Sequence, residues 1–295
     1  MTVRSFSVAV PDGTLSAEHW AGPRPTIVLL HAGVADRRSW TGTVERLMGT
    51  LDLVAYDRRG FGKSPPGSSP YRPVDDLAAV LDEVAAGQCW LVGSSQGCKI
   101  ALDFTLLFPD RVAGLVLLAP AVSGAPPDSD EVESETQRLS DLIDAADAAG
   151  DLAEVNRHEA WLWLDGPAEP NGRVSGATRD LALEMNAIAL SHEAEDQALP
   201  SEVNAWHRLD QIRVPVTVAW GDLDVPVMID HSRHLADHLP DARGQVIPQT
   251  AHLPYLGPRF PDGLLVVHDG ENTPEVTADG EVRPNTNFKF VPRGR

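Results

Sequence analysis

Cysteine and long apolar runs are scarce in this 295-residue chain. Its two cysteines, Cys89 and Cys98, do not make a disulfide framework or a zinc site, so we interpret them as reduced, buried thiols and expect no metal. The longest apolar run, about residues 112–122, is shorter than the roughly 20 residues of a membrane span. Residues 1–10 lack the charged start and apolar centre of a signal peptide. We therefore expect a cytoplasmic protein without a membrane segment.

Positive charge is also limited. The chain has 24 Lys and Arg against 43 Asp and Glu, a net charge of −19, which argues against nucleic acid or an anionic membrane as a partner. Residues 126–205 hold 19 Asp and Glu but only 4 Lys and Arg, which gives this segment a net charge of −15. The remaining residues together have a net charge of −4. A solvated helical surface is the simpler interpretation of this segment. A field that disfavours anionic substrates is the alternative.

Apolar runs and helical patterns alternate along much of the chain. After an expected hairpin over 6–10 and 15–20, continuous apolar runs predict strands buried on both faces. The expected strands are 26–30, 51–56, the run from Cys89 to Gly93, 112–118, 214–220 and 245–247. The expected helices are 39–48, 74–86, a stretch from about residue 97 to 107, and 230–238. This alternation predicts an α/β fold with a mostly parallel sheet and helices on both faces.

The alternation stops between residues 123 and 205. This segment has no convincing strand, and its periodicity predicts helices over 132–149, 152–161 and 177–190. We interpret it as a helical cap inserted into the α/β core.

A serine lies at a tight turn between an expected strand and an expected helix. Gly93, Ser95 and Gly97 have the G-x-S-x-G spacing, in which small residues allow a sharp turn that projects the serine hydroxyl outward. Gly and Ser are common in any loop, so the spacing alone is a weak signal, but its place between strand and helix strengthens it. We predict that Ser95 is a nucleophile.

Five stretches in a fixed order resemble the α/β-hydrolase fold superfamily, and the resemblance covers about residues 3–258. These stretches are His31-Ala32-Gly33, Asp57 to Ser64, Gly93 to Gly97, Gly221 to Asp224, and Ala251 to Pro254. The resemblance implies a hydrolase core of residues 1–122 and 206–258, a cap of 123–205 and an atypical tail of 259–295. It does not specify a substrate.

The resemblance also implies a catalytic triad in the order serine, acid, histidine. Ser95, Asp224 and His252 fit that order, with His252 as the base and Asp224 as the residue that orients it. Asp222 is the alternative acid. If Asp222 is not the acid, we expect it to shape the turn after the strand. We expect His31 to shape a loop and not to transfer protons.

Two backbone amides are expected to stabilise an oxyanion. By position these belong to Gln96, directly after the nucleophile, and Gly33, after the first long apolar strand. Val34 is the alternative second donor, because Ala32 replaces the glycine that usually follows the histidine.

Other motifs have simpler explanations. Lys63-Ser64 resembles the end of a phosphate-binding loop, but Asp57 occupies the position of its first glycine, so we expect a structural turn there. His231, His234 and His238 share one helix face, and we expect a surface helix and not a zinc site. Val34, Trp161 and Trp163 are candidate substrate-binding residues, with packing inside the cap as the alternative for the tryptophans.

The end of the chain departs from the family pattern. Residues 257–263 are too rich in Gly and Pro to continue as the usual last helix. Residues 260–272 and 287–292 resemble the end of β-propeller phytases, but a match of about thirty residues is smaller than one propeller blade of four strands and implies no phytase activity. We expect strands at 264–268 and 288–291. Two explanations remain open, an unrelated ending that replaced the last helix and a divergent native tail.

The sequence therefore predicts a serine hydrolase without a cofactor, acting on a small ester, lactone or thioester. A ligand-binding receptor of the same fold with little turnover is one alternative. A relative that hydrolyses C–C bonds or forms peracids is another. Related epoxide hydrolases and haloalkane dehalogenases place Asp at the strand-to-helix turn that holds Ser95 here, the nucleophile elbow, so Ser95 argues against both activities. The sequence does not indicate the oligomeric state.

Overall fold

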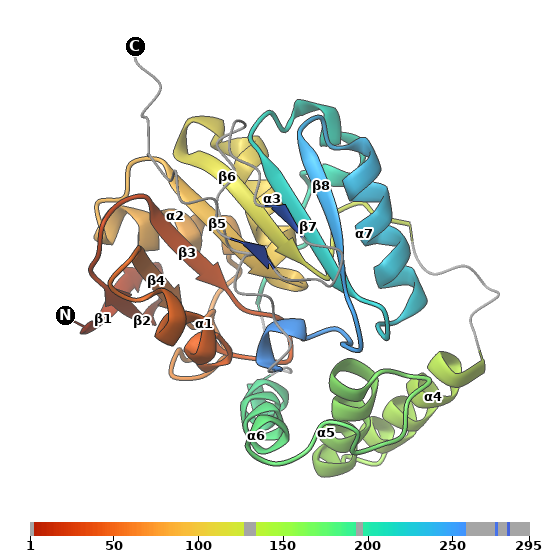
Figure 1. The fold of residues 1–295 in the computed structure, drawn as a ribbon. Coiled ribbons are helices and arrows are strands. Elements are labelled where there is room, and N and C mark those ends of the chain that lie inside the picture. Colours follow the sequence, from red (N-terminus) through yellow and green to blue (C-terminus); the bar gives the residue numbers. More distant parts are fainter. Residues whose placement is uncertain (1–2, 127–133, 193–196, 258–274, 277–281, 284–295) are drawn as a thin grey trace.

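A computed structural model describes residues 3–126, 134–192, 197–257, 275–276 and 282–283. Its centre is an eight-stranded sheet in the order β1-β2-β4-β3-β5-β6-β7-β8. β1, β2 and β4 pair antiparallel, and all later pairs are parallel (Figure 1). The strands are β1 (Val3–Val10), β2 (Gly13–Trp20), β3 (Thr26–Leu30), β4 (Asp52–Tyr56), β5 (Cys89–Ser94), β6 (Val112–Leu118), β7 (Val216–Gly221) and β8 (Ala242–Ile247).

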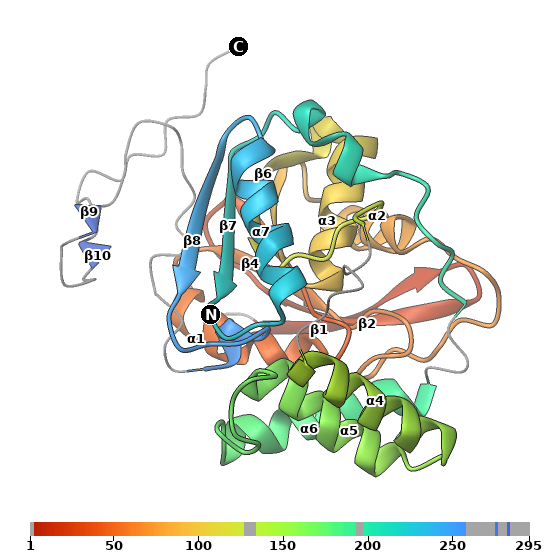
Figure 2. The ribbon, with the colours of Figure 1, turned by 90° about the vertical axis from the view of Figure 1, so that its right-hand side faces the viewer.

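Helices cover both faces of the sheet (Figure 2). The helices are α1 (Thr41–Leu47), α2 (Pro73–Glu83), α3 (Gln96–Leu107), α4 (Ser134–Ala148), α5 (Leu152–Ala160), α6 (Ala177–His192) and α7 (Pro226–His238). The short helical turns are η1 (Arg37–Trp40), η2 (Pro109–Arg111), η3 (Trp161–Asp165), η5 (Ala205–His207), η6 (Leu209–Gln211) and η7 (Pro254–Leu256). The α/β-hydrolase fold predicted from the sequence is therefore confirmed.

The central strands are apolar throughout because each of their faces packs against helices. In β3 all five residues are buried, and successive side chains enter opposite cores. Val28 and Leu30 pack in the core beneath α2, α3 and α7, whereas Ile27 and Leu29 pack in the core that includes Trp40 and residues of α1. At roughly 25 cal/mol per Å² of buried apolar surface, these two cores are the main stabilising contribution to the fold.

The acidic middle segment forms helices at the carboxyl ends of the parallel strands (Figure 1). α4, α5 and α6 correspond to the three expected helices, with bounds that differ by a few residues. The expected single helix over 39–48 is instead the turn η1 followed by α1, and α7 begins four residues earlier than expected, with Pro226 in its first turn. Proline suits this position because the first helical amide has no partner inside the helix.

The tail contributes little to the described structure. Its described residues form two short antiparallel strands, β9 (Glu275–Val276) and β10 (Val282–Arg283). The strands expected at 264–268 and 288–291 lie outside the described residues, and so do the stretches 260–272 and 287–292 that were compared with β-propeller phytases. Within the part of the chain that is described, no helix has the length and apolar character needed to cross a membrane.

Candidate active site

Ser95 lies at the turn between β5 and α3, with a backbone φ of 50° and ψ of −115°. A positive φ is costly for a side chain other than glycine, so the surrounding structure must hold it. The flanking glycines allow the turn. A Cβ on Gly93 would lie 2.6 Å from the amide nitrogen of Cys98, and one on Gly97 would lie 2.3 Å from the carbonyl oxygen of Leu30. The chain therefore needs glycine at both positions to turn this sharply.

His252 and Asp224 form a buried hydrogen-bonded pair. The Nδ1 atom of His252 lies 2.9 and 3.1 Å from the two carboxylate oxygens of Asp224, and the side chains are 4% and 0% exposed. Asp224 follows β7, and His252 lies in the loop after β8, so parallel neighbouring strands bring residues 28 positions apart together. When Nδ1–H donates to Asp224, Nε2 of the neutral ring is left as the proton acceptor.

Asp222, the alternative acid, faces elsewhere. Its Oδ1 accepts a hydrogen bond from the backbone amide of Gln249 at 2.6 Å. Gln249 itself has a positive φ of 58°. Asp222 thus holds the turn that precedes His252, which is the structural role considered for it from the sequence.

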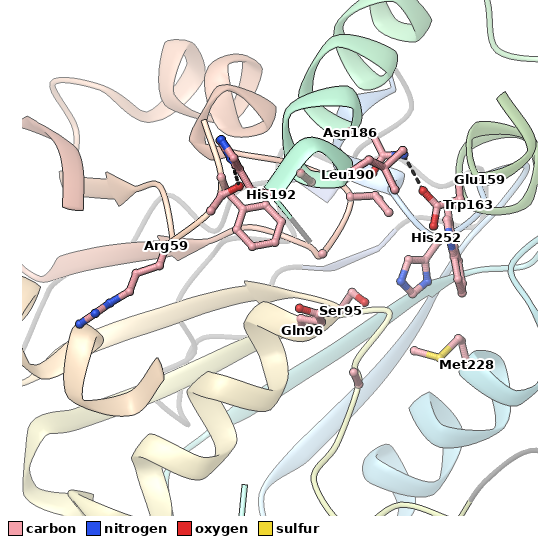
Figure 3. A pocket seen from close by; sticks show the side chains of 16 residues that line it. Arg59, Ser95, Gln96, Glu159, Trp163, Asn186, Leu190, His192, Met228 and His252 are labelled. Atoms are coloured by element: carbon pink, nitrogen blue, oxygen red, sulfur yellow. Dashed lines mark hydrogen bonds between the residues drawn. The ribbon is translucent and has the colours of Figure 1, made fainter. Parts of the chain in front are cut away.

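Ser95 and His252 open onto one cavity of about 390 Å³ (Figure 3). The cavity also brings together four other predicted site residues: Gly33, Val34, Gln96 and Trp163. Its remaining lining residues are Arg59, Gly60, Phe61, Ala121, Glu159, Asn186, Ala189, Leu190, His192 and Met228. The floor comes from the sheet edge, and the facing wall comes from α5, η3 and α6.

The loop after β3 lies against the side chain of Gln96. A Cβ on Gly33 would lie 2.7 Å from Nε2 of Gln96. Arg58 connects the two, since one of its Nη atoms donates to Oε1 of Gln96 and the other to the carbonyl oxygen of Ala32, each at 3.0 Å. Within the described residues, the backbone amides of Gly33 and Gln96 donate to no other group of the chain. Both residues also line the cavity.

His31 fixes this loop. One ring nitrogen lies 2.8 Å from the carbonyl oxygen of Ala32, and the other accepts the backbone amide of Arg58 at 3.0 Å. Burial, with the nearby Arg58 charge, holds the pKa of His31 well below its usual range. His31 therefore remains neutral and fully bonded at neutral pH.

The two candidate tryptophans differ in position. Trp163 lines the cavity, its ring centroid lies 4.7 Å from that of His252, and its carbonyl oxygen accepts the His252 backbone amide at 3.1 Å. Trp161 does not line this cavity, contrary to the expectation of a substrate-binding role. Its indole N–H donates to the carbonyl oxygen of Glu169 at 2.7 Å, and Arg138 lies over its ring. η3 has π-helical geometry, which spacing in the sequence does not reveal.

The loop from Asp57 to Ser64 forms a tight structural turn. Asp57 is fully buried and accepts the backbone amides of Arg37 and Lys63, each at 2.9 Å. Gly62 has a positive φ, and a Cβ there would lie 2.5 Å from the carboxylate of Asp57. Asp57 therefore stabilises this turn through buried hydrogen bonds, the structural role expected from the sequence.

Several cavity residues had no signal in the sequence. Glu159 on α5 and Asn186 on α6 are 27 positions apart, yet Nδ2 of Asn186 donates to Oε2 of Glu159 at 2.6 Å. The same Nδ2 donates to Oδ1 of Asn156 at 3.0 Å. Only the packing of α5 against α6 brings these side chains together. A residue on a polar helix face looks the same in the sequence whether it faces solvent or a cavity.

Two histidines of α7, His234 and His238, stack with Trp206 of η5. The ring centroids of Trp206 and His234 are 4.0 Å apart, and those of His234 and His238 are 3.9 Å apart. Among the described residues, no group of three or more His, Cys, Asp or Glu side chains could hold a metal ion.

Comparisons with known proteins show which family the chain belongs to. The chain is 25% identical over 258 residues to the "Putative 2-succinyl-6-hydroxy-2,4-cyclohexadiene-1-carboxylate synthase" of Bacillus subtilis, covering 84% of this chain and 92% of the relative. It is 28% identical over 233 residues to the pimeloyl-[acyl-carrier protein] methyl ester esterase of Neisseria meningitidis, covering 78% and 87%. A thermophilic esterase from Thermogutta terrifontis has a similar structure, with a TM-score of 0.64, 23% identity and coverage of 86% and 93%. Residues 25–257 match the model of the alpha/beta hydrolase fold family, and the chain therefore belongs to that family.

Proposed function

We propose that the protein is a serine hydrolase that cleaves a small ester, lactone or thioester through an acyl-enzyme on Ser95. The observation that carries the proposal is the hydrogen bond from Nδ1 of His252 to Asp224, with Ser95 and His252 on one cavity. The esterase among its relatives, and the family as a whole, agree with this chemistry.

In the first half-reaction, Oγ of Ser95 attacks the carbonyl carbon of the substrate while Nε2 of His252 takes the hydroxyl proton. Asp224 stabilises the imidazolium that results. The tetrahedral intermediate then collapses, the bond to the alcohol or thiol breaks, and the leaving group takes the proton from Nε2. The products are a free alcohol or thiol and an acylated Ser95.

In the second half-reaction, a water molecule attacks the acyl carbon and His252 again accepts the proton. Collapse releases the carboxylic acid and returns the proton to Oγ of Ser95. In both halves the backbone amides of Gly33 and Gln96 donate to the oxyanion, and one such donor is worth about 2.7–4 kcal/mol. No step needs a cofactor.

The surroundings of the site have supporting roles in this proposal. Val34 and Trp163 bind the substrate, and α4 to α6 act as a cap that limits access to Ser95. The buried thiols Cys89 and Cys98 suit a reducing, cytoplasmic setting. A small molecule is the partner that the cavity accommodates.

A panel of p-nitrophenyl esters, lactones and thioesters tests the proposal. We expect Ser95→Ala to lower kcat by at least about 10³-fold on every substrate that the wild type hydrolyses. Ser94→Ala is the matched control, because it removes a buried hydroxyl one residue away, outside the cavity lining. Ser94→Ala should retain activity within a few-fold. Equal rates for wild type and Ser95→Ala across the panel would remove the proposed chemistry.

A further inference from the structure

The side chain of Gln96 lies at the boundary between two cavities. Gln96 lines the cavity beside Ser95, and Figure 3 shows the two residues next to each other there. Gln96 also lines a second cavity of about 670 Å³, which residues of α2 and α3 line as well. Two neighbours of the Gln96 side chain differ in position, since Arg58 lines only the second cavity and Gly33 lines only the cavity beside Ser95. The side-chain amide therefore has one neighbour toward each cavity.

Arg58 fixes the direction of this amide. One Nη atom of Arg58 donates to Oε1 of Gln96 and the other to the carbonyl oxygen of Ala32, each at 3.0 Å. The guanidinium also lies over the ring of Phe61, with 4.3 Å between Cζ and the ring centroid. A guanidinium has donors but no acceptor, so the amide atom that faces Arg58 must be the oxygen. The NH₂ group of Gln96 is therefore directed away from Arg58.

That NH₂ group lies beside Gly33. A Cβ at Gly33 would be 2.7 Å from Nε2 of Gln96, so a residue with a side chain would displace the amide. Within the described residues, Nε2 donates to no group of the chain. By standard bond lengths, Nε2 lies no more than about 5.2 Å from the backbone nitrogen of Gly33. Two donors at that separation can both reach one oxygen atom, because each N–H···O bond spans about 2.9 Å.

The bond from Arg58 also makes Nε2–H a better donor. Hydrogen bonds in a chain polarise one another, so a cationic donor on Oε1 draws electron density from the amide nitrogen. A hydrogen bond to a negative oxygen is stronger than one to a neutral carbonyl. A donor at this place therefore favours the transition state, in which the oxygen gains negative charge, over the bound substrate.

We propose that the side chain of Gln96 is a third donor to the oxyanion, beside the backbone amides of Gly33 and Gln96, and that Arg58 is the positioning residue that orients it. The inference rests on the proposed function and adds a catalytic group to the same site. When Ser95 attacks, Nε2–H donates to the former carbonyl oxygen as that oxygen becomes negative. The proton stays on Nε2, and the bond weakens again when the intermediate collapses to the acyl-enzyme.

A pair of substrates reports on the contact in the transition state. p-Nitrophenyl acetate and its thiono analogue, in which sulfur replaces the carbonyl oxygen, differ at the atom that becomes negative, and sulfur is a weak acceptor. Gln96→Met keeps the length of the side chain and has no N–H. It should lower kcat/KM for the oxygen ester about 10–100-fold. The thiono ester should lose much less, so that the ratio of oxygen to sulfur rates falls at least about fivefold.

A second variant separates the donor from a structural role. Gln96→Glu keeps an oxygen that accepts from Arg58 and pairs with its charge, but it has no N–H and places a negative oxygen beside Gly33. It should lower kcat/KM for the oxygen ester at least about 100-fold, more than Gln96→Met does. If Gln96 served only as a partner for Arg58, Gln96→Glu would retain the wild-type rate.

Lys99→Met is the matched control, because Lys99 lies one turn along α3 and lines only the second of the two cavities. It should keep both rates within about twofold. Gln96 is exposed, so both of its substitutions should leave the fold intact, and urea unfolding checks this.

Two results would overturn the role of the Gln96 side chain: an unchanged ratio of oxygen to sulfur rates in Gln96→Met, or wild-type activity in Gln96→Glu. Ser95→Ala on the oxygen ester judges the proposed function separately. If Ser95→Ala is inactive while the ratio is unchanged, the proposed function stands without this donor. Full activity of Ser95→Ala removes the proposed function itself.

Discussion

At the scale of single residues, the account depends on which carboxylate orients His252. Spacing from Gly221 left Asp224 and Asp222 as candidates, because both follow the same strand within three residues. The fold separates them, since Asp224 bonds the ring of His252 and Asp222 bonds the amide of Gln249. Which of two neighbouring side chains points inward depends on the backbone of the turn, and one sequence does not determine that direction.

We predict opposite results for the two aspartates. Asp224→Asn should lower kcat by about 10⁴-fold on a p-nitrophenyl ester, because an amide does not hold His252 in the required tautomer. Asp222→Asn keeps an oxygen that accepts from Gln249 and should retain activity within a few-fold. Steady-state kinetics on both variants, with circular dichroism to check folding, make the comparison. A larger loss in Asp222→Asn would assign the acid to the other carboxylate.

At the scale of elements, the elbow was predictable because its requirements are local. A buried strand, two glycines and a helical pattern lie within about 15 residues, and the spacing itself reports the steric demand. The helical turns were less predictable. Trp161 and Trp163 look equivalent in the sequence, but the π-helical turn η3 places one against Glu169 and the other against His252.

The elbow makes a prediction about stability. Gly97→Ala puts a methyl group 2.3 Å from a backbone carbonyl that cannot move away, and overpacking of this kind costs about 1–3 kcal/mol of unfolding free energy. Helix propensity alone predicts the opposite sign, because it favours Ala over Gly by about 1 kcal/mol. Urea unfolding measures the difference. Gly87→Ala, where a Cβ meets nothing within 4 Å, is the control and should be neutral or slightly stabilising. A Gly97→Ala variant as stable as the control would contradict the steric account.

At the scale of the whole molecule, alternation of strands and helices predicted the fold class but not the arrangement of the cavity wall. The order in which β4 and β3 lie in the sheet, and the contact of α5 with α6, depend on packing between distant segments. Asn186 and Glu159 meet only in the folded chain. The helices at 134–192 were expected from periodicity, whereas the side that each presents to Ser95 was not.

The burial of His31 predicts how the stability of the whole molecule depends on pH. The pKa of His31 is lowered in the folded state. Below about pH 6.5, His31 is therefore protonated in the unfolded chain while it stays neutral in the folded chain. The free energy of unfolding should therefore fall as pH falls from about 6.5 toward the lowered pKa, by up to about 1.4 kcal/mol per unit from this group.

Urea unfolding at about pH 7.5, 6.5 and 5.5 tests this dependence. His31→Gln should lower stability at the highest pH, through the loss of two hydrogen bonds, but should show a shallower fall below pH 6.5. His207→Gln removes an exposed histidine and should keep the wild-type slope. An unchanged slope in His31→Gln would show that His31 is protonated in the folded protein.

The central claim is that Ser95 forms a covalent intermediate. The most direct measurement is mass spectrometry of the protein after reaction with a fluorophosphonate, followed by peptide mapping. The account predicts one phosphonyl group per chain, located on Ser95, with labelling abolished in Ser95→Ala and strongly slowed in Asp224→Asn. A folded wild-type protein that hydrolyses esters while Ser95 stays unlabelled, or that carries the label on another residue, would contradict it.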